Sequence, residues 1–416
     1  MKTSRIALTV LFVAVTAQSQ QRATFMAQNK GGGIPPTFTD NFTRANAVLS
    51  SPWAEPVASS TGGDLQIISN KVLAHGTQPG SHYLDIYTGG AFGGNQYCIT
   101  TVETVATTGP FATQGCVVRG KVLNQYYNDI VPNVTGNGGD WAIGIDDGSD
   151  FVIAEPLFTG STSYSIGDTH ELDVVGTNPT FFWSYHNGIP EATAVDTVTN
   201  YTGGVPGLGS VVDMNATPTV ASGPWTGGTL PPLSTTHTDN FSRPNGLLGV
   251  NWWFLPTTDH GVDCAFTIVS HQAASGCTGA ADNGVAIWTT AFGSPQGSVV
   301  TLGTSAAAGW IGPVVRAAPN QSGTNYYTTI YFGGTMLLFA RSGGTFNSLA
   351  ATLCSPGSTP STIELDASGT SPVVLTVKVN GSACGSPFSD STYLLTGAYE
   401  GFATAGNSTV AGWTGN

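Results

Sequence analysis

Short alternating stretches dominate the pattern of apolar and polar positions along the chain. Residues 373–379 are rich in β-branched side chains, alternate apolar with polar over their last five positions, and are followed by Asn380-Gly381, the dipeptide of a tight hairpin. Residues 326–332 end at a Gly-Gly pair, and residues 181–185 end close to Asn187-Gly188. No stretch of a dozen residues carries a helical stripe. The pattern therefore predicts an all-β chain of antiparallel strands, arranged as sandwiches or barrels.

One ten-residue motif occurs twice. Residues 37–46 read Thr-Phe-Thr-Asp-Asn-Phe-Thr-Arg-Ala-Asn, and residues 236–245, which lie 199 positions later (236 − 37), read Thr-His-Thr-Asp-Asn-Phe-Ser-Arg-Pro-Asn. Further matches keep their order, and the last pairs Trp225-Thr226-Gly227 with Trp413-Thr414-Gly415. The sequence thus predicts two copies of one fold joined by a short Pro-rich linker. The predicted bounds are 37–228 for the first copy, 229–235 for the linker and 236–416 for the second copy.

The first residues have the features of a secretion signal. A basic start is followed by an apolar run at residues 6–15 and by the small-residue cleavage site Val15-Thr16-Ala17. We expect a signal peptide at 1–17 and a flexible lead-in at 18–36, with a buried N-terminal strand or helix as the alternative. No later run approaches the about 20 apolar residues of a membrane span. The sequence therefore predicts a secreted, extracellular protein without a membrane span.

The six cysteines fall into three pairs, and each pair flanks a turn signal almost symmetrically. This spacing predicts local disulfides across hairpins in an oxidising compartment, with six buried free thiols as the alternative. The predicted pairs are Cys98–Cys116, Cys264–Cys277 and Cys354–Cys384.

Charge excludes some classes of partner. The 416 residues include 12 basic and 25 acidic side chains, for a net charge of −13, and only 9% of residues are charged. A chain with so few basic residues is a poor binder of nucleic acid or of anionic membranes.

The order of these signals resembles the concanavalin A-like jelly roll in its laminin-G-like form. The motifs on which this resemblance rests are Asp40-Asn41-Phe42, Val117-Val118-Arg119, Tyr126-Tyr127, Val379-Asn380-Gly381 and the Gly-rich stretch at 203–208. The resemblance covers both copies and implies two tandem antiparallel β-sandwich domains. It also implies that the first strand of each copy pairs with the last. Phe42 and Trp53 would then lie in the core, and Asp40 would pair with Arg44 on the same side of its strand.

One stretch looks catalytic. His170-Glu171-Leu172-Asp173 resembles the E-x-D-x-x-E strand of laminarinase-type glycoside hydrolases, which share this fold and use two carboxylates. Gly176 stands where the last Glu of that motif belongs, and Glu364-Leu365-Asp366 in the second copy lacks the last Glu as well. We therefore predict that the protein is not an enzyme.

Two kinds of binding site remain as hypotheses. Four carboxylates near a Gly turn could hold Ca²⁺ in the first copy, although Asp-Gly turns are also common without metal; they are Asp140, Asp146, Asp147 and Asp150. Exposed aromatic side chains could stack on sugar faces, although tryptophans in β domains are mostly core residues; the candidates are Trp141, Tyr185, Trp253 and Trp288.

The leading hypothesis is a secreted, non-catalytic protein that binds carbohydrate or a cell surface through duplicated lectin-like domains. Its partner would be a glycan or another cell-surface component. The first alternative is a structural subunit of an extracellular fibre, surface layer or virion appendage, whose partners are copies of itself. The second alternative is a glycoside hydrolase.

Overall fold

A computed structural model of the chain describes thirteen ranges of residues. They are 37–55, 63–76, 81–104, 112–121, 124–130, 141–146, 156–160, 164–212, 221–254, 266–276, 283–304, 309–319 and 324–416. The regular structure in these ranges is strand throughout, so the prediction of an all-β chain is confirmed. A search of the same ranges finds no helix with the length and hydropathy needed to cross a membrane.

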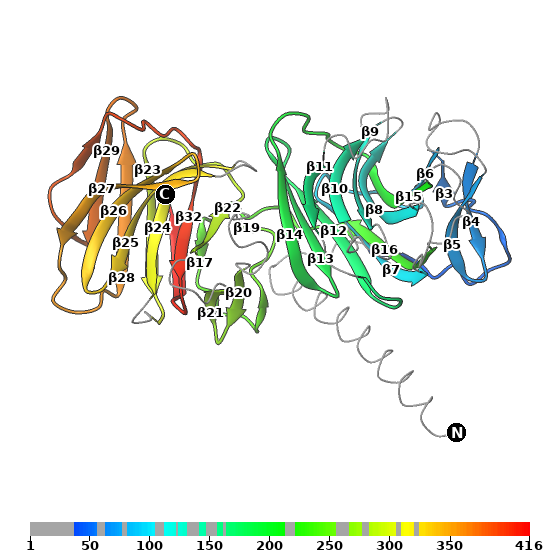
Figure 1. Cartoon of the computed structure of the whole chain (residues 1–416), viewed down its shortest axis with the longest axis horizontal. Coiled ribbons are helices and arrows are strands. Elements are labelled where there is room, and N and C mark those ends of the chain that lie inside the picture. The colour runs from blue at the N-terminus through cyan, green and yellow to red at the C-terminus, as the bar shows by residue number, and fades with distance from the viewer. Residues whose placement is uncertain are drawn as a thin grey trace, which may run out of the picture. The chain divides into compact units, whose positions relative to one another are not determined.

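The strands up to residue 229 form two antiparallel sheets (Figure 1). In spatial order, the nine-stranded sheet contains β14 (Ile189–Asp196), β13 (Thr180–His186), β12 (Thr169–Val175), β7 (Gln96–Thr104), β16 (Ala221–Thr229), β5 (Lys71–Gly76), β4 (Gly63–Ile68) and β2 (Ala47–Val48), and β1 (Thr37–Asp40) also pairs with β16. The first seven-stranded sheet contains β11 (Pro156–Gly160), β10 (Trp141–Asp146), β9 (Asn124–Ile130), β8 (Ala112–Lys121), β15 (Val205–Val212), β6 (Ser81–Tyr87) and β3 (Trp53–Ala54).

The remaining strands form a second pair of antiparallel sheets, shown in green to red in Figure 1. In spatial order, the ten-stranded sheet contains β18 (Gly246–Leu247), β20 (Phe266–Val269), β21 (Gln272–Ser275), β33 (Thr409–Gly415), β23 (Gln296–Leu302), β28 (Thr362–Ser368), β29 (Val373–Val379) and β30 (Ser382–Ala383); β17 (Thr238–Asp239) also pairs with β33, and β31 (Phe388–Asp390) with β29. The second seven-stranded sheet contains β19 (Trp252–Phe254), β22 (Asn283–Trp288), β32 (Tyr399–Ala405), β24 (Trp310–Ala318), β25 (Asn325–Phe332), β26 (Thr335–Ser342) and β27 (Thr345–Cys354).

No described strand of one pair of sheets forms a β-ladder with a strand of the other pair. The chain also separates into two compact units, and the change from one to the other falls between Pro232 and Leu233, inside the predicted linker. Residues 176–183 and 190–200 group with the second unit, whereas the sequence places them in the first copy. Strand β16 continues to Thr229, so the first residue of the predicted linker is part of a strand.

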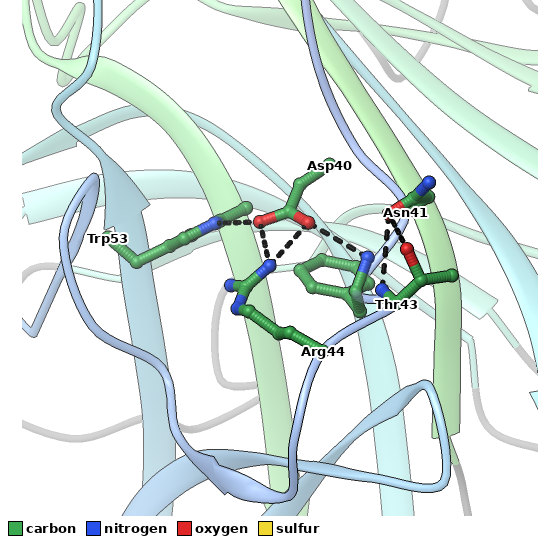
Figure 2. Close-up of polar contacts among 6 residues, drawn as sticks. Asp40, Asn41, Thr43, Arg44 and Trp53 are labelled. Atoms are coloured by element: carbon green, nitrogen blue, oxygen red, sulfur yellow. Dashed lines mark hydrogen bonds and ion pairs between the residues drawn. The ribbon is translucent and has the colours of Figure 1, made fainter.

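The repeated motif ties the two sheets of the first half together. Asp40 ends β1 of the nine-stranded sheet, and its carboxylate accepts hydrogen bonds from Trp53 Nε1 (2.8 Å), which lies in β3 of the other sheet, and from Arg44 Nη1 (2.7 and 2.9 Å) (Figure 2). The backbone N–H of Phe42 donates to the same carboxylate at 2.8 Å. Burial alone would raise the pKa of Asp40, but these donors hold it below its usual value.

The second half repeats this arrangement with the same residue types, although its arginine uses two nitrogens where Arg44 uses one. The carboxylate of Asp239 accepts hydrogen bonds from the backbone N–H of Phe241 (2.8 Å), from Trp252 Nε1 (2.8 Å), and from Arg243 Nη1 and Nη2 (2.7 and 2.9 Å). Asp239 lies in the ten-stranded sheet and Trp252 in the second seven-stranded sheet. We call each set of Asp, Phe, Arg and Trp an aspartate lock: Asp40, Phe42, Arg44 and Trp53 in the first half, and Asp239, Phe241, Arg243 and Trp252 in the second.

The predicted pairings of the motif are confirmed, but one reason for them was wrong. Strand β1 does pair with β16, with Asp40 opposite Trp225, and the ring of Phe42 is fully buried. Asp40 and Arg44 do pair, although they do not lie on one face of a continuous strand. The strand ends at Asp40, Phe42 has a φ of 55°, and the chain folds back so that Arg44 meets the carboxylate.

Two of the three predicted disulfides lie in the described residues, and both are present. Cys98 bonds Cys116, and Cys354 bonds Cys384, each with a Cα–Cα distance of 5.5 Å. The hairpin geometry predicted for them is wrong. Cys98 is in β7 and Cys116 in β8, strands of different sheets, so the first disulfide crosses the core. Likewise, Cys354 ends β27 of one sheet, and Cys384 follows β30 of the other. The third pair, Cys264 and Cys277, lies outside the described residues.

The aspartate lock can be tested by substitution of Asp239. Asp239→Ala leaves the buried indole N–H of Trp252 and one guanidinium without their acceptor, and we expect it to lower the free energy of unfolding by about 3 kcal/mol. Urea unfolding followed by tryptophan fluorescence measures this loss. Asn240→Ala is the matched control, since it removes one exposed local hydrogen bond and is expected to change the free energy by less than about 1 kcal/mol. Equal effects of the two substitutions would contradict the lock.

The disulfide between the sheets of the second half makes a separate prediction. Cys354 and Cys384 are 30 residues apart, and a closed loop of this length restricts the unfolded chain by about 3.5 kcal/mol. The double substitution Cys354→Ser and Cys384→Ser should lower the free energy of unfolding by roughly that amount. Urea unfolding of oxidised protein measures it, and an unchanged midpoint would show that the disulfide contributes nothing to stability.

Candidate functional site

Three of the four aromatic residues predicted to stack on sugars are buried, so the expectation that they are exposed is wrong. Tyr185, Trp253 and Trp288 are 7%, 0% and 1% exposed. Trp288 packs in the core against Trp252 (ring centroids 5.0 Å apart) and Trp413 (5.2 Å). Because Trp288 is the register partner of Trp252, Trp253 and Trp288 point to opposite faces of the same sheet.

The fourth aromatic residue and the predicted calcium ligands lie largely outside the description. Trp141 begins β10 and Asp146 ends it, but their side chains are not described. Asp140, Asp147 and Asp150 fall outside the described residues altogether, so the calcium site stays a prediction. Within the described ranges, no group of three or more His, Cys, Asp or Glu side chains is placed to hold a metal ion.

The strand that resembles a hydrolase motif carries ion pairs in the second half. In β28, Ile363, Leu365 and Ala367 point into the core, so Glu364 and Asp366 lie on the other face of the ten-stranded sheet. Lys378 of β29 lies within 2.7 Å of Glu364 Oε1 and 2.8 Å of Asp366 Oδ2. The hydrogen bonds to these two carboxylates raise the pKa of Lys378 to about 12. Both carboxylates therefore share one permanent cation.

The corresponding strand of the first half places a histidine in the core. His170 of β12 is fully buried, and neither ring nitrogen has a hydrogen-bond partner. Burial, with a smaller effect of the nearby His186, lowers the pKa of His170 to about 3, so the ring is neutral at physiological pH. Tyr164 packs between the two imidazoles, with centroids 5.3 and 4.2 Å away, and His186 Nε2 bonds Asp168 Oδ2 at 2.9 Å.

The most unusual chemistry lies on the outer face of the second seven-stranded sheet. Two adjacent tyrosines define this face. The hydroxyl of Tyr327 donates to Asp390, which belongs to the ten-stranded sheet, so Tyr327 points into the core between the sheets. Side chains alternate along a strand, and Tyr326 therefore points away from the core.

The register of β25, β26 and β27 extends this outer face. Tyr326 pairs with Arg341, and Arg341 pairs with Phe346, so the three side chains form one row across three strands. The guanidinium carbon of Arg341 lies 5.9 Å from the ring centroid of Tyr326 and 5.7 Å from that of Phe346. The centroid of Phe346 lies 6.3, 6.1 and 6.0 Å from those of Trp310, Tyr326 and Phe339.

Several polar atoms on this face are buried without partners. They are Nε and Nη1 of Arg341, the hydroxyl of Tyr326, and the hydroxyl of Thr324, which precedes β25 by one residue. Arg341 and Tyr326 are 4% and 0% exposed, whereas Phe339 and Phe346 are half-buried. No carboxylate of the described residues forms an ion pair with Arg341. We call this set the arginine face: Trp310, Thr324, Tyr326, Phe339, Arg341 and Phe346.

The arginine face can hold a ligand by two kinds of contact. Its rings offer apolar surfaces to a sugar or another flat group, and its unpartnered N–H and O–H groups can donate hydrogen bonds. Burial raises the pKa of Tyr326, so its hydroxyl keeps its proton at physiological pH. Sequence reasoning missed this site because Tyr326 and Tyr327 look equivalent until the register shows which of them faces the core.

The first half differs at the matching position. Tyr126 of β9, which corresponds to Tyr326 in the sequence repeat, pairs with Ile145 of β10. Ile145 thus takes the register position that Arg341 has in the second half. The first half has no guanidinium at this position.

Comparisons with known proteins give a fold-level likeness without a family. No protein-family model matches the sequence, and no curated protein matches it. Among solved structures, the chain is similar to the carbohydrate-binding module CBM66 from Bacillus subtilis (10% identity, 42% of this chain and 96% of that one, TM-score 0.30). It is also similar to the Ca²⁺- and Man2-bound exoplasmic/lumenal domain of VIP36 (9%, 48% and 89%, TM-score 0.33).

A third similar structure is the CBM2 module of the evolved Dit of Lactobacillus casei BL23 phage J-1 (10% identity, 46% of this chain and 94% of that one, TM-score 0.31). At these identities and TM-scores, the likenesses carry no argument about ligand or activity. The arginine face is derived from this chain's own residues.

A buried carboxyl in the second seven-stranded sheet predicts how the stability of the protein depends on pH. Glu400 of β32 is fully buried, and burial raises its pKa to about 8, although the backbone N–H groups of Asn416 and Gly297 donate to it at 3.2 and 3.0 Å. The unfolded chain loses this proton near pH 4.5, so between about pH 4.5 and 8 the folded state binds the extra proton. The free energy of unfolding should therefore fall as pH rises through this window.

Glu400→Gln removes the titrating group and should remove this part of the slope. Chemical unfolding of both proteins at intervals from pH 4.5 to pH 8.5 measures the difference, since all other groups are shared. Parallel pH profiles for the two proteins would show that Glu400 ionises normally.

Proposed function

We propose that the chain is a secreted, non-catalytic binding protein and that its second sandwich binds carbohydrate on the arginine face. The observation that carries this proposal is the cluster of unpartnered, buried donors among aromatic rings on a face turned away from the opposing sheet. Buried polar groups normally have partners, and aromatic rings with a few placed polar groups are the usual lining of sugar and small-molecule sites.

The absence of catalysis in this proposal is supported by the carboxylates of the hydrolase-like strand. Retaining and inverting glycosidases need one carboxyl group that holds a proton and a second that stays ionised. Glu364 and Asp366 both bind Lys378, and Gly176 and Gly369 stand where another carboxyl would be required.

Secretion and duplication belong to the same proposal. The disulfides between the sheets fit an oxidising compartment, and the predicted signal peptide at 1–17 would direct export. The two aspartate locks have the same partners in the same geometry, as expected if one domain was copied. The copies then diverged at the position of Arg341.

A second candidate function, a self-assembling extracellular subunit, is favoured by one edge strand. Strand β27 is the last described strand of its sheet, is ten residues long, and reads Thr-Phe-Asn-Ser-Leu-Ala-Ala-Thr-Leu-Cys, without charge or proline, although its ladder with β26 has two register shifts. Natural proteins usually protect such edges with charges, prolines or bulges, because an open edge can pair with another chain. Size-exclusion chromatography with light scattering tests this candidate, and monomers up to high concentration would exclude it.

Carbohydrate binding by the second sandwich is tested with a glycan array and isothermal titration calorimetry on the mature full chain. We expect at least one polysaccharide class to bind and Phe339→Ala to weaken that binding roughly tenfold, since a half-buried ring of the face is lost. The control is Val269→Ala, which truncates an exposed side chain on the other sheet of the same half and should leave the affinity unchanged. A blank array would overturn the proposal.

A further inference from the structure

Arg341 is a buried cation without a counter-charge. The Arg341 residue is 4% exposed, it pairs with no described carboxylate, and two of its guanidinium nitrogens, Nε and Nη1, donate no hydrogen bond. The rings of Tyr326 and Phe346 offer it weak cation–π contacts at 5.9 and 5.7 Å, and the guanidinium lies close enough to the Tyr326 hydroxyl to offset part of the burial-driven rise in the pKa of that hydroxyl. An unpaired buried charge is strongly unfavourable, so such a site has a large unmet affinity for an anion.

Donor groups next to Arg341 add to this preference. The hydroxyl of Tyr326 keeps its proton and has no acceptor, and the hydroxyl of Thr324 also has no partner. Three side chains at one end of the β25–β26 pair therefore present several donors and no anionic acceptor. The planar guanidinium, with its fixed donor directions, is well suited to oxyanions such as carboxylates and sulfates.

We propose that the arginine face recognises an acidic sugar, one that carries a carboxylate or a sulfate, and that Arg341 and Tyr326 bind the anionic group. This inference rests on the proposed carbohydrate-binding function and adds the ligand's charge to it. The sugar ring lies against Phe339 and Phe346, while its oxyanion accepts hydrogen bonds from the guanidinium and the tyrosine hydroxyl. Phe346 lies over the guanidinium on the edge strand β27, which is hydrogen-bonded on one side, so movement of this ring opens the way to Arg341.

The charge of the whole chain determines how this binding depends on salt. The net charge of −13 repels a polyanion at long range. The proposed recognition therefore does not rely on attraction to a surface patch of basic side chains. Recognition then depends on short-range contacts at one buried cation. Added salt screens the repulsion between the two net charges more than it screens the buried pair. Affinity for the acidic sugar should therefore survive an increase from 0.1 M to about 0.5 M salt, at which binding to a basic surface would collapse.

The experiment compares one oligosaccharide with and without its charge. Calorimetry on the full chain uses oligogalacturonate, its methyl ester as the neutral match, and a sulfated dextran as the second anion. We expect the wild type to bind one of the anionic probes at least about tenfold more tightly than the ester. Arg341→Met should abolish that difference, and Tyr326→Phe, which removes only the hydroxyl, should reduce it about threefold to tenfold. Dependence on oligogalacturonate identifies a carboxylate, and dependence on the dextran identifies a sulfate.

Controls separate this result from changes in folding or total charge. Lys378→Met removes one positive charge from the other sheet and should leave the preference for the acid intact. Melting temperatures of all variants show whether they fold. Equal binding of acid and ester, or a preference that persists in Arg341→Met, overturns the acidic-sugar inference and leaves the proposed function standing. Binding of none of the three probes also overturns the inference, and the glycan array then decides the proposed function separately.

Discussion

Each half of this protein depends on one carboxylate that joins its first strand to the opposite sheet. Asp40 and Asp239 end the strands that pair with β16 and β33, while their indole partners, Trp53 and Trp252, lie in the other sheet. The hydrogen bonds from the indoles therefore span the sandwich at its closing edge. This link matters most in the second half, where the first strand, β17, has only two residues.

The aspartate lock also explains why the repeated motif is so long. Phe42 and Phe241 donate their backbone N–H groups to the carboxylate, both have a positive φ, and both rings are fully buried. The last Asn of the motif serves another hairpin, because Asn46 and Asn245 accept hydrogen bonds from the backbone N–H of Ser69 and Ser270. The Asp, Arg and Asn residues named here thus have structural tasks in both copies of the motif.

The two halves use one framework for different ends. In the second half, Trp413 Nε1 donates to Ser298 Oγ at 2.9 Å, and the corresponding residue of the first half is Cys98, which forms a disulfide instead. These residues correspond because both pair with a leucine and a glycine of the neighbouring strands. Arg341 and Ile145 likewise occupy matching register positions in the two halves. The closing edge is shared, and individual side chains at matching positions differ between the halves.

The sequence by itself determined the strands, the repeat and the cysteine pairs that the structure describes. Alternation, turn dipeptides and spacing are local properties, and they survive in any fold that keeps these strands. Only the tertiary structure decided which face of each strand is covered. Trp253 and Trp288 were candidates for exposed sugar-binding residues, but both are buried. The adjacent Tyr326 and Tyr327 point to opposite faces of their sheet. Burial depends on which sheet lies opposite and on the register between distant strands, and neither quantity is written in the neighbouring residues.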